Sequence, residues 1–301
     1  MEFEQFKTFA QVFGVRRNRK QKDRFLENLK GVFGSYGYTM TIYEDKMGLH
    51  KIKHALFGDL KNANEIYVVG YDTTENNVVG NGKYWPINEN RNRSSVFVNL
   101  TINLILSIVM AVVGVYFIAL GISKEKIEKI LWIILGVITL FITNKVSQGR
   151  TNRSTFAKTS SIFLVFEILK KTKKKNIAFM FLDNGSFSKI GINFLKKDDL
   201  IRDDQRIIYL DCFSDGDRLL ICSDKLAKDK AMNLLKMYQG EKVYVNLDEC
   251  ESNKFEDINN IVVLCNAYEE NDGSFAVHNV KTDDDLTIDG ETIDKVAEML
   301  A

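Results

Sequence analysis

Residues 96–122 read VFVNLTINLILSIVMAVVGVYFIALGI and contain no charged side chain. A helix needs about 20 consecutive apolar residues to cross the hydrocarbon core of a bilayer, and this run exceeds that length. A second apolar run, ILWIILGVITLFIT at residues 130–143, falls slightly short of it. It reaches the length if flanking side chains extend it to the interfaces, namely Ile127, Lys129, Lys145 and Val146. The sequence therefore predicts a transmembrane helical hairpin over residues 95–146.

The alternative to a membrane hairpin is a pair of helices buried in a large soluble core. The two runs are separated only by the connector SKEK at residues 123–126, so either reading gives a hairpin. A soluble core helix rarely stays uncharged on all sides over such a length, which favours the membrane. The absence of an ionisable residue in the middle of either run argues against an ion or proton path.

Small and polar residues in the predicted hairpin mark surfaces where helices can approach closely. The candidates for such packing are Asn103, Ser107, Gly114, Gly121 and Gly136. Small side chains at a helix interface bring backbones together inside a bilayer. These residues serve either the packing of the two spans against each other or contact with another integral membrane protein.

The bulk composition is that of a chain with a full hydrophobic core and no strong electrostatic field. The protein has 301 residues, of which 45% are hydrophobic and 27% charged, and its formal net charge is +1. A near-neutral chain is not expected to bind nucleic acid. The basic run KKTKKK at residues 170–175 is interpreted as a solvated helix end, with contact to anionic lipid headgroups as the alternative. The four cysteines have neither paired nor metal-binding spacing, which is typical of free thiols in a reducing compartment.

Two spans return the chain to its starting side, so the flanking regions share one compartment. The flanks carry more basic residues than the connector. The flanks contain Arg91, Arg93, Lys145, Arg150 and Arg153, whereas the connector and its neighbours contain Lys124, Lys126 and Lys129. Basic loops remain in the cytoplasm. The N-terminus also lacks a basic region followed by an apolar stretch, so no cleavable signal peptide is expected. The sequence predicts a two-pass protein of the cell membrane with both termini and the main domain in the cytoplasm.

The flanking regions alternate between strand-like and helix-like segments. Expected helices cover residues 19–33, 160–169, 225–237 and 291–300, and expected strands cover residues 38–43, 66–70, 177–182, 207–210, 219–222 and 261–265. Such alternation is typical of an α/β sheet covered by helices on both faces. The first flank has only two clear strands and is incomplete alone. We expect residues 1–94 and 147–301 to be two parts of one domain interrupted by the hairpin.

Short motifs in the flanks follow one another in the order of a known enzyme family. The segment Gly70-Tyr71-Asp72-Thr73, directly after a strand, resembles the His-x-Asp-Thr motif of the co-catalytic di-zinc aminopeptidases. The family's later motifs are similar to TNRST at residues 151–155, the strand at 177–182 with Gly185-Ser186 after it, Asp211 at a strand end, and KTDDD at residues 281–285 before the last helix. The resemblance implies an aminopeptidase-like mixed sheet.

The resemblance also implies that the catalytic site is degenerate. The five zinc-ligand positions fall on Gly70, Thr151, Ser186, Asp211 and Lys281, and the general-base position falls on Gly185. Zinc requires nitrogen, thiolate or carboxylate ligands, and of these residues only Asp211 supplies one. The expected cofactor content is therefore none.

The vestigial cleft keeps several polar candidates, which are Asp72, Asp183, Asp211, His278 and Lys281. An unconventional zinc site built from His278 and the aspartates is the alternative, and it would make the protein a divergent membrane-bound metallo-aminopeptidase. Another histidine pair, His50 and His54, has the spacing of a shared helix face, but Lys51 stands where metalloproteases have a glutamate. This pair is interpreted as a solvated surface feature.

The leading functional hypothesis is a membrane-anchored pseudo-peptidase that acts as a non-catalytic binding or scaffolding subunit. Its partner would be a peptide or another integral membrane protein, such as a transporter. A third hypothesis places the function in the hairpin itself.

Overall fold

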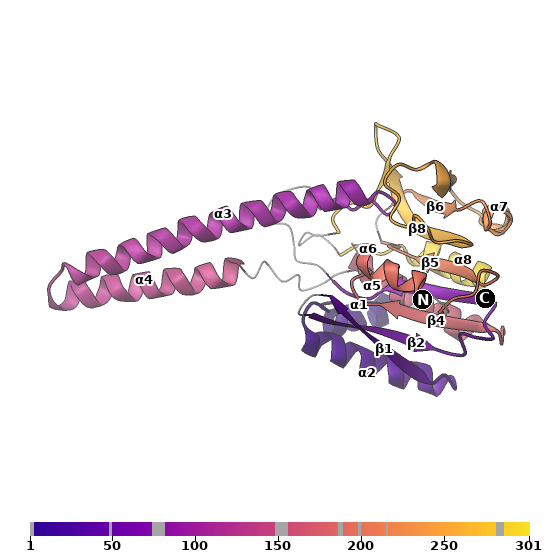
Figure 1. Ribbon diagram of the computed structural model, residues 1–301, viewed down its shortest axis with the longest axis horizontal. Coiled ribbons are helices and arrows are strands. Elements are labelled where there is room, and N and C mark those ends of the chain that lie inside the picture. The colour runs from indigo at the N-terminus through magenta and orange to yellow at the C-terminus, as the bar shows by residue number, and fades with distance from the viewer. Residues whose placement is uncertain are drawn as a thin grey trace.

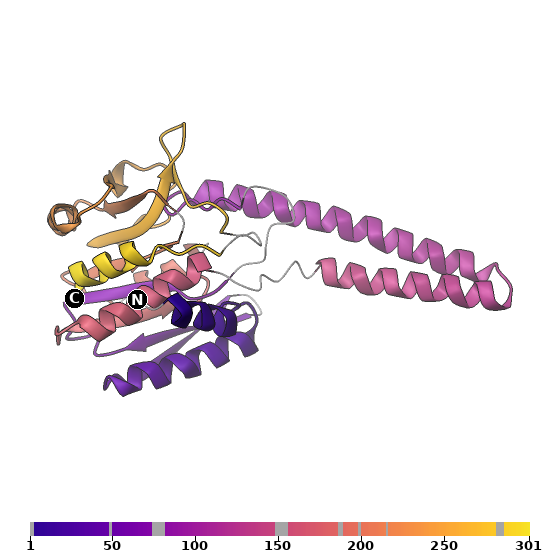
Figure 2. The same cartoon turned by 180° about the vertical axis from the view of Figure 1, so that it is seen from behind.

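The computed structural model describes residues 3–47, 50–73, 82–147, 156–185, 189–197, 200–214, 216–280 and 286–301. It consists of an α/β domain from which a long helical hairpin projects (Figure 1). The view from behind shows the same arrangement, with the hairpin leaving one end of the domain and the chain's C-terminus lying at the other (Figure 2).

A nine-stranded mixed sheet forms the centre of the domain, in the order β1-β2-β4-β3-β5-β8-β6-β7, with β9 paired to β8. The strands are β1 (Met40–Met47), β2 (His50–Phe57), β3 (Glu65–Gly70), β4 (Ile177–Leu182), β5 (Arg206–Leu210), β6 (Arg218–Ser223), β7 (Lys242–Asn246), β8 (Ile261–Glu269) and β9 (Phe275–Ala276). The four central strands β4, β3, β5 and β8 run parallel. Their near-continuous apolar sequences fit burial on both faces.

Strand β3 joins the two parts of the chain that the hairpin separates. It hydrogen-bonds to β4 on one side and to β5 on the other, and both of those strands follow the hairpin in sequence. The sheet therefore contains strands from before and after the hairpin, with β3 enclosed between later ones.

Helices cover one face of the sheet, and shorter elements cover the other. The first core contains side chains of α1 (Phe3–Phe13), α2 (Arg19–Ser35), α5 (Phe156–Lys171), α7 (Lys228–Met237) and α8 (Gly290–Leu300). Aromatic rings are prominent there, and Phe33 of α2 stacks on Phe57 of β2 at 4.1 Å. The second core is closed by α6 (Lys189–Ile192), by the 3₁₀ turns η1 (Asn193–Lys196) and η2 (Leu247–Glu249), and by loops.

The strand β2 corrects the interpretation of His50 and His54. Residues 50–57 form a strand that pairs with both β1 and β4, not a helix. His54 is buried, with 2% of its surface exposed, and its ring stacks on Phe194 at 4.0 Å. The prediction of a solvated pair is therefore wrong for His54.

The hairpin consists of α3 (Glu89–Ile122) and α4 (Lys126–Ser147). Both views show the two helices running side by side (Figures 1 and 2). Among the described residues, α3 alone is long and apolar enough to cross a membrane, and only 11% of its most apolar 18-residue stretch is buried. The same criterion does not support α4 as a second span.

Glycines lie where the two hairpin helices meet. A Cβ atom on Gly136 would lie 2.5 Å from Cγ1 of Ile118 and 2.8 Å from the carbonyl oxygen of Gly114. Cβ atoms on Gly114 and Gly121 would also meet the facing helix at 3.0 Å. The close approach of α3 and α4 therefore depends on these residues having no side chain.

We expect Gly136→Ala to loosen the hairpin, because the added methyl group has no free space and overpacking costs about 1–3 kcal/mol. Hydrogen exchange in detergent should be faster in α3 and α4 than in the wild type. The matched control is Gly31→Ala in α2, where a Cβ atom meets nothing within 4 Å. That change should stabilise the domain by about 0.5–1 kcal/mol. Equal exchange rates in the hairpins of both variants would contradict the packing.

Candidate functional site

The carboxyl ends of β3, β4 and β5 bring together three of the predicted cleft residues. Asp72, Asp183 and Asp211 each follow one of these strands within two residues, and all three are buried. Parallel strands present their carboxyl ends at one edge of a sheet, which is where α/β proteins place their sites. The sequence-predicted aspartates therefore lie at the expected edge.

The carboxylate of Asp211 accepts hydrogen bonds from two lysines, a tyrosine and the thiol of Cys212, whose Sγ lies 3.5 Å from Oδ1. Lys158 donates a hydrogen bond to Oδ1. Lys254 Nζ lies 3.0 Å from Oδ2, and the Tyr84 hydroxyl donates to the same oxygen at 2.6 Å. The two lysine side chains are 3% and 2% exposed, so the whole cluster is shielded from water.

Tyr84 connects the two ammonium groups. Lys254 Nζ donates to its hydroxyl at 2.6 Å, and Lys158 Nζ lies 3.7 Å from its ring centroid. Cation–π contact of this kind strengthens when water is excluded. Tyr84 itself is held by a backbone bridge to Val277.

The protonation states in the cluster follow from burial and from the mutual attraction of the charges. Burial alone would raise the pKa of Asp211, but Lys158, Lys254 and the Tyr84 hydroxyl outweigh it and hold that pKa below its usual range. Burial would lower the pKa of Lys158, whereas Asp211 raises it, with a net increase. For Lys254 burial prevails over Asp211 and lowers the pKa. The shifts of Asp211 and Lys158 favour a carboxylate beside an ammonium group, whereas the shift of Lys254 opposes the charged form of that side chain.

Sequence reasoning missed both lysines. Lys158 lies in the first turn of α5, in a segment that is buried from Phe156 to Leu169. A lysine just before the apolar stretch of this helix was the available signal, because a lysine buried there needs an internal counter-ion. Lys254 comes from an irregular loop after η2, and nothing in its neighbourhood distinguishes it from a surface lysine.

Gly185, the predicted general-base position, leaves no room for a side chain. A Cβ atom on Gly185 would lie 2.8 Å from Cβ of Leu182. The backbone N–H of Gly185 donates to Asp72 Oδ1 at 2.9 Å. Asp72 thus supports the loop after β4. The neighbouring Arg16 is also buried, which lowers its pKa to about 9 although Asp72 opposes the shift.

Asp183 is held by contacts of its own. Lys22 Nζ lies 2.5 Å from Oδ1, and the backbone N–H of Asn184 donates to the same oxygen at 2.9 Å. Burial raises the pKa of Asp183, and Lys22 opposes this. The backbone N–H of Asp183 donates to Nδ1 of His54 at 3.3 Å, and burial lowers the pKa of that histidine to about 4. Neutral His54 therefore belongs to the structural core.

His278 does not join the aspartates. Its Nε2 lies 2.7 Å from Oε1 of Glu270, and its ring stacks on Tyr268 at 4.7 Å, both on or beside the β8–β9 hairpin. Within the described ranges, no group of three or more histidine, cysteine, aspartate or glutamate side chains is placed to hold a metal ion. Three predicted family positions, Thr151, Ser186 and Lys281, lie outside the described residues.

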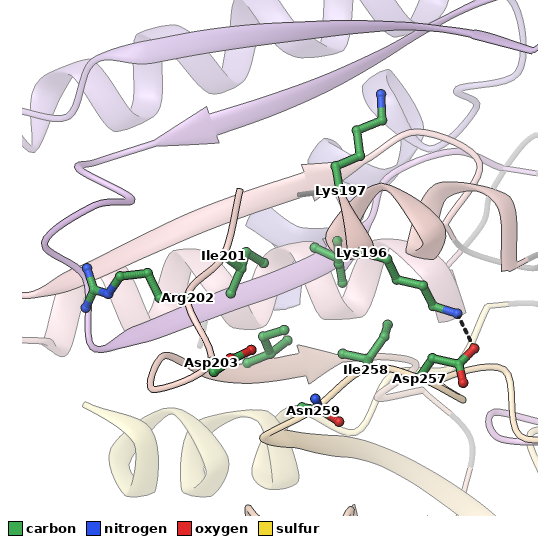
Figure 3. A pocket seen from close by; sticks show the side chains of 10 residues that line it. Lys196, Lys197, Ile201, Arg202, Asp203, Asp257, Ile258 and Asn259 are labelled. Atoms are coloured by element: carbon green, nitrogen blue, oxygen red, sulfur yellow. Dashed lines mark hydrogen bonds and ion pairs between the residues drawn. The ribbon is translucent and has the colours of Figure 1, made fainter. Parts of the chain in front are cut away.

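Two cavities of the domain are large enough for a small ligand. One of about 540 Å³ lies beside η1 and the loops that lead into β5 and β8 (Figure 3). Its cationic side chains are paired, and Lys196 meets Asp257 at 2.9 Å while Arg202 meets Asp204 at 2.9 Å. The other, of about 670 Å³, lies at the carboxyl ends of β3 and β4, where Tyr71 and Asp183 line it.

Comparison with known proteins identifies the architecture. The sequence matches no family model and no curated protein. The crystal structure of Porphyromonas gingivalis glutaminyl cyclase aligns with a TM-score of 0.56 at 12% identity, covering 98% of this chain and 94% of that one. Macrostomum lignano glutaminyl cyclase gives 0.53 at 8% identity, with 100% and 87% covered. The Legionella pneumophila LapA aminopeptidase gives 0.52 at 11% identity, with 98% and 66% covered.

The fold is aminopeptidase-like. The prediction of a mixed α/β sheet of this type from the order of the motifs is therefore confirmed. At these identities the likeness concerns the fold, and the activities of the matched enzymes do not follow from it.

We expect Asp211→Ala to destabilise the domain by about 3–5 kcal/mol, because it leaves two buried lysines without their shared counter-ion. Urea unfolding in detergent measures the change. Asp211→Leu combined with Lys254→Met should recover part of the loss, since one of the stranded charges is then gone. The control is Asp204→Ala, which breaks an exposed pair with Arg202 and should change little. Equal effects of Asp211→Ala and Asp204→Ala would show that the cluster does not stabilise the fold.

Proposed function

We propose that the protein is a membrane-anchored, non-catalytic binding subunit with an aminopeptidase-like domain. The observation that carries the proposal is the pair of ammonium groups on Asp211. In the enzyme family that the sequence resembles, this position is one of the five zinc-ligand positions. Here both carboxylate oxygens are bound by positively charged side chains, which repel a metal cation.

The other described positions also fail to fit a zinc centre. Gly70 has no side-chain donor, and a side chain at Gly185 would collide with Leu182. The lysine cluster supplies the positive charge that metal ions would otherwise bring to the buried carboxylate. The lysine cluster can therefore stabilise the fold of the cleft without zinc ions and without zinc-dependent hydrolysis.

The surface of the hairpin supports a position in the bilayer. Most of the exposed large apolar side chains of the protein lie on α3 and α4, with Phe97 70% exposed and Ile127 74% exposed. Contiguous apolar surface on this scale marks contact with a membrane or with other proteins. We propose that α3 spans the bilayer and that α4 returns the chain to the side of the domain.

The anchored domain would bind a peptide or another integral membrane protein at its former cleft. The alternative function is a divergent metallo-aminopeptidase with an unconventional zinc site. Because His278 is occupied by Glu270 and Tyr268, no contact of the described residues favours that alternative.

Purified protein is expected to contain less than stoichiometric zinc and to have no turnover. Elemental analysis measures the metal, and the assays offer aminoacyl substrates and peptides with an N-terminal glutamine, after the activities named for the matched structures. A positive control enzyme is assayed in the same detergent. Zinc-dependent turnover that disappears in Tyr84→Phe would overturn the proposal. This variant keeps both lysines and removes only the hydroxyl group of the cluster, so the loss would assign the activity to this site.

The membrane arrangement predicts that the hairpin tip and the domain lie on opposite sides. In a background without the four native cysteines, Ser123→Cys at the tip should react with an impermeant maleimide on intact cells. Tyr36→Cys, at the exposed end of α2, should react only after permeabilisation. Labelling of both from the same side would contradict the two-span arrangement.

A further inference from the structure

The 670 Å³ cavity at the carboxyl ends of β3 and β4 has a strongly basic lining. It lies between the first turn of α2 and the beginning of β2. Its charged side chains are five cations and two carboxylates, namely Arg17, Arg19, Lys22, Lys51 and Lys53 against Asp23 and Asp183. A concave site with this imbalance attracts anions.

The carboxylates of the lining do not neutralise its cations. Asp23 is shared, because Lys53 Nζ lies 2.6 Å from it and Arg19 Nε lies 3.7 Å from it. Lys51 meets Glu44, outside the lining, at 3.5 Å, and both of these side chains are about half exposed. Lys22 is held by Asp183 at 2.5 Å in a shielded pair. The longer pairs of Arg19 and Lys51 are exposed and weak, so these two cations can turn to a better acceptor.

The backbone adds to the positive potential. Helix α2 has 17 residues, and its N-terminus with the capping residue Asn18 borders the cavity. The N-terminal end of a helix carries a partial positive charge and favours a phosphate group nearby. Side chains and helix therefore act in the same direction.

The position of the cavity relates it to the hairpin. Lys53 and Asp183 lie at the carboxyl end of β4, as the pairing of Ala55 with Phe181 requires. In Figure 1 the hairpin leaves one end of the domain and the chain's C-terminus lies at the other. The carbonyl oxygen of Leu300 accepts a hydrogen bond from Tyr67 near the start of β3, so the carboxyl ends of the parallel strands, and the cavity beside them, lie toward the hairpin.

The lysine run at residues 170–175, considered from the sequence as a lipid contact, lies at the opposite end. Lys174 Nζ meets Glu65 at the start of β3 at 3.1 Å and the carbonyl oxygen of Leu300 at 2.7 Å. Lys171 pairs with Glu298 of α8 at 3.2 Å. These lysines support the C-terminal helix and face away from the hairpin.

We infer that the cavity binds the phosphate of an anionic phospholipid headgroup. The inference rests on the proposed membrane insertion of the hairpin, which places the cavity near the headgroup layer. Lysine and arginine near an anionic leaflet each contribute about 1 kcal/mol to such binding, and the attraction weakens with salt.

The test uses the full chain in a neutral detergent, with native mass spectrometry and titration of dioctanoyl phosphatidylglycerol, dioctanoyl phosphatidylcholine and inorganic phosphate. Phosphatidylglycerol should bind more tightly than phosphatidylcholine. The double variant Arg19→Gln, Lys51→Gln should lose roughly tenfold in affinity for phosphatidylglycerol, because it removes two exposed cations of the lining.

The matched control is Lys170→Gln, Lys171→Gln, which removes the same charge at the opposite end and should bind as the wild type does. An equal loss in both double variants, or no preference for phosphatidylglycerol, overturns the inference. Inorganic phosphate binding without binding of the lipid also overturns it, since the cavity would then take a free anion. If maleimide labelling shows that the hairpin is inserted but the protein has no lipid preference, this inference alone is refuted. If labelling shows that the hairpin is not inserted, the proposed function is refuted.

Discussion

The carboxylate of Asp211 binds side chains from three segments that are far apart in sequence, one before the hairpin and two after it. Tyr84 precedes α3 by a few residues, Lys158 follows the hairpin at the start of α5, and Lys254 comes from a loop near the other end of the chain. Each of these side chains is bound to the same buried group. A buried charge without partners is costly, so all three segments are restrained at once. The segments that flank the hairpin are therefore anchored at one buried carboxylate.

This arrangement relates the sheet edge to the proposed role of the protein. The carboxyl edge of the parallel strands carries the aspartates, the lysine cluster and the basic cavity, and the hairpin departs from the same side. The part of this edge around Asp211 is occupied by buried ion pairs. The cavity beside it remains accessible. Binding at this edge and anchoring in a bilayer are thus compatible in space.

The sequence was sufficient for the architecture because the central strands are apolar on both faces. IAFMFL at β4 and EIYVVG at β3 have few polar side chains and stand next to recognisable loops. Strand β2 escaped detection because HKIKHALF begins with histidine and lysine residues, a pattern that resembles a surface segment. The pairing that buries its second half depends on β4, more than a hundred residues away, and no local signal reports it.

The candidate site was predictable only in its acidic half. The aspartates follow buried strands, so their position at one edge could be inferred. The lysines that complete the cluster lie 53 and 43 residues from Asp211, and their partners are decided by tertiary structure. Lysine is usually a surface residue, which makes its buried use difficult to recognise from sequence.

The enclosed position of β3 has a consequence for biosynthesis. Its neighbours β4 and β5 lie beyond the whole hairpin, so β3 leaves the ribosome long before either partner exists. Contacts between such distant segments form slowly, and an apolar strand is prone to aggregation until it is paired. The apolar helices emerge in that interval. The hairpin is therefore complete before the sheet, and the domain closes around its central strand only when the later half has been made.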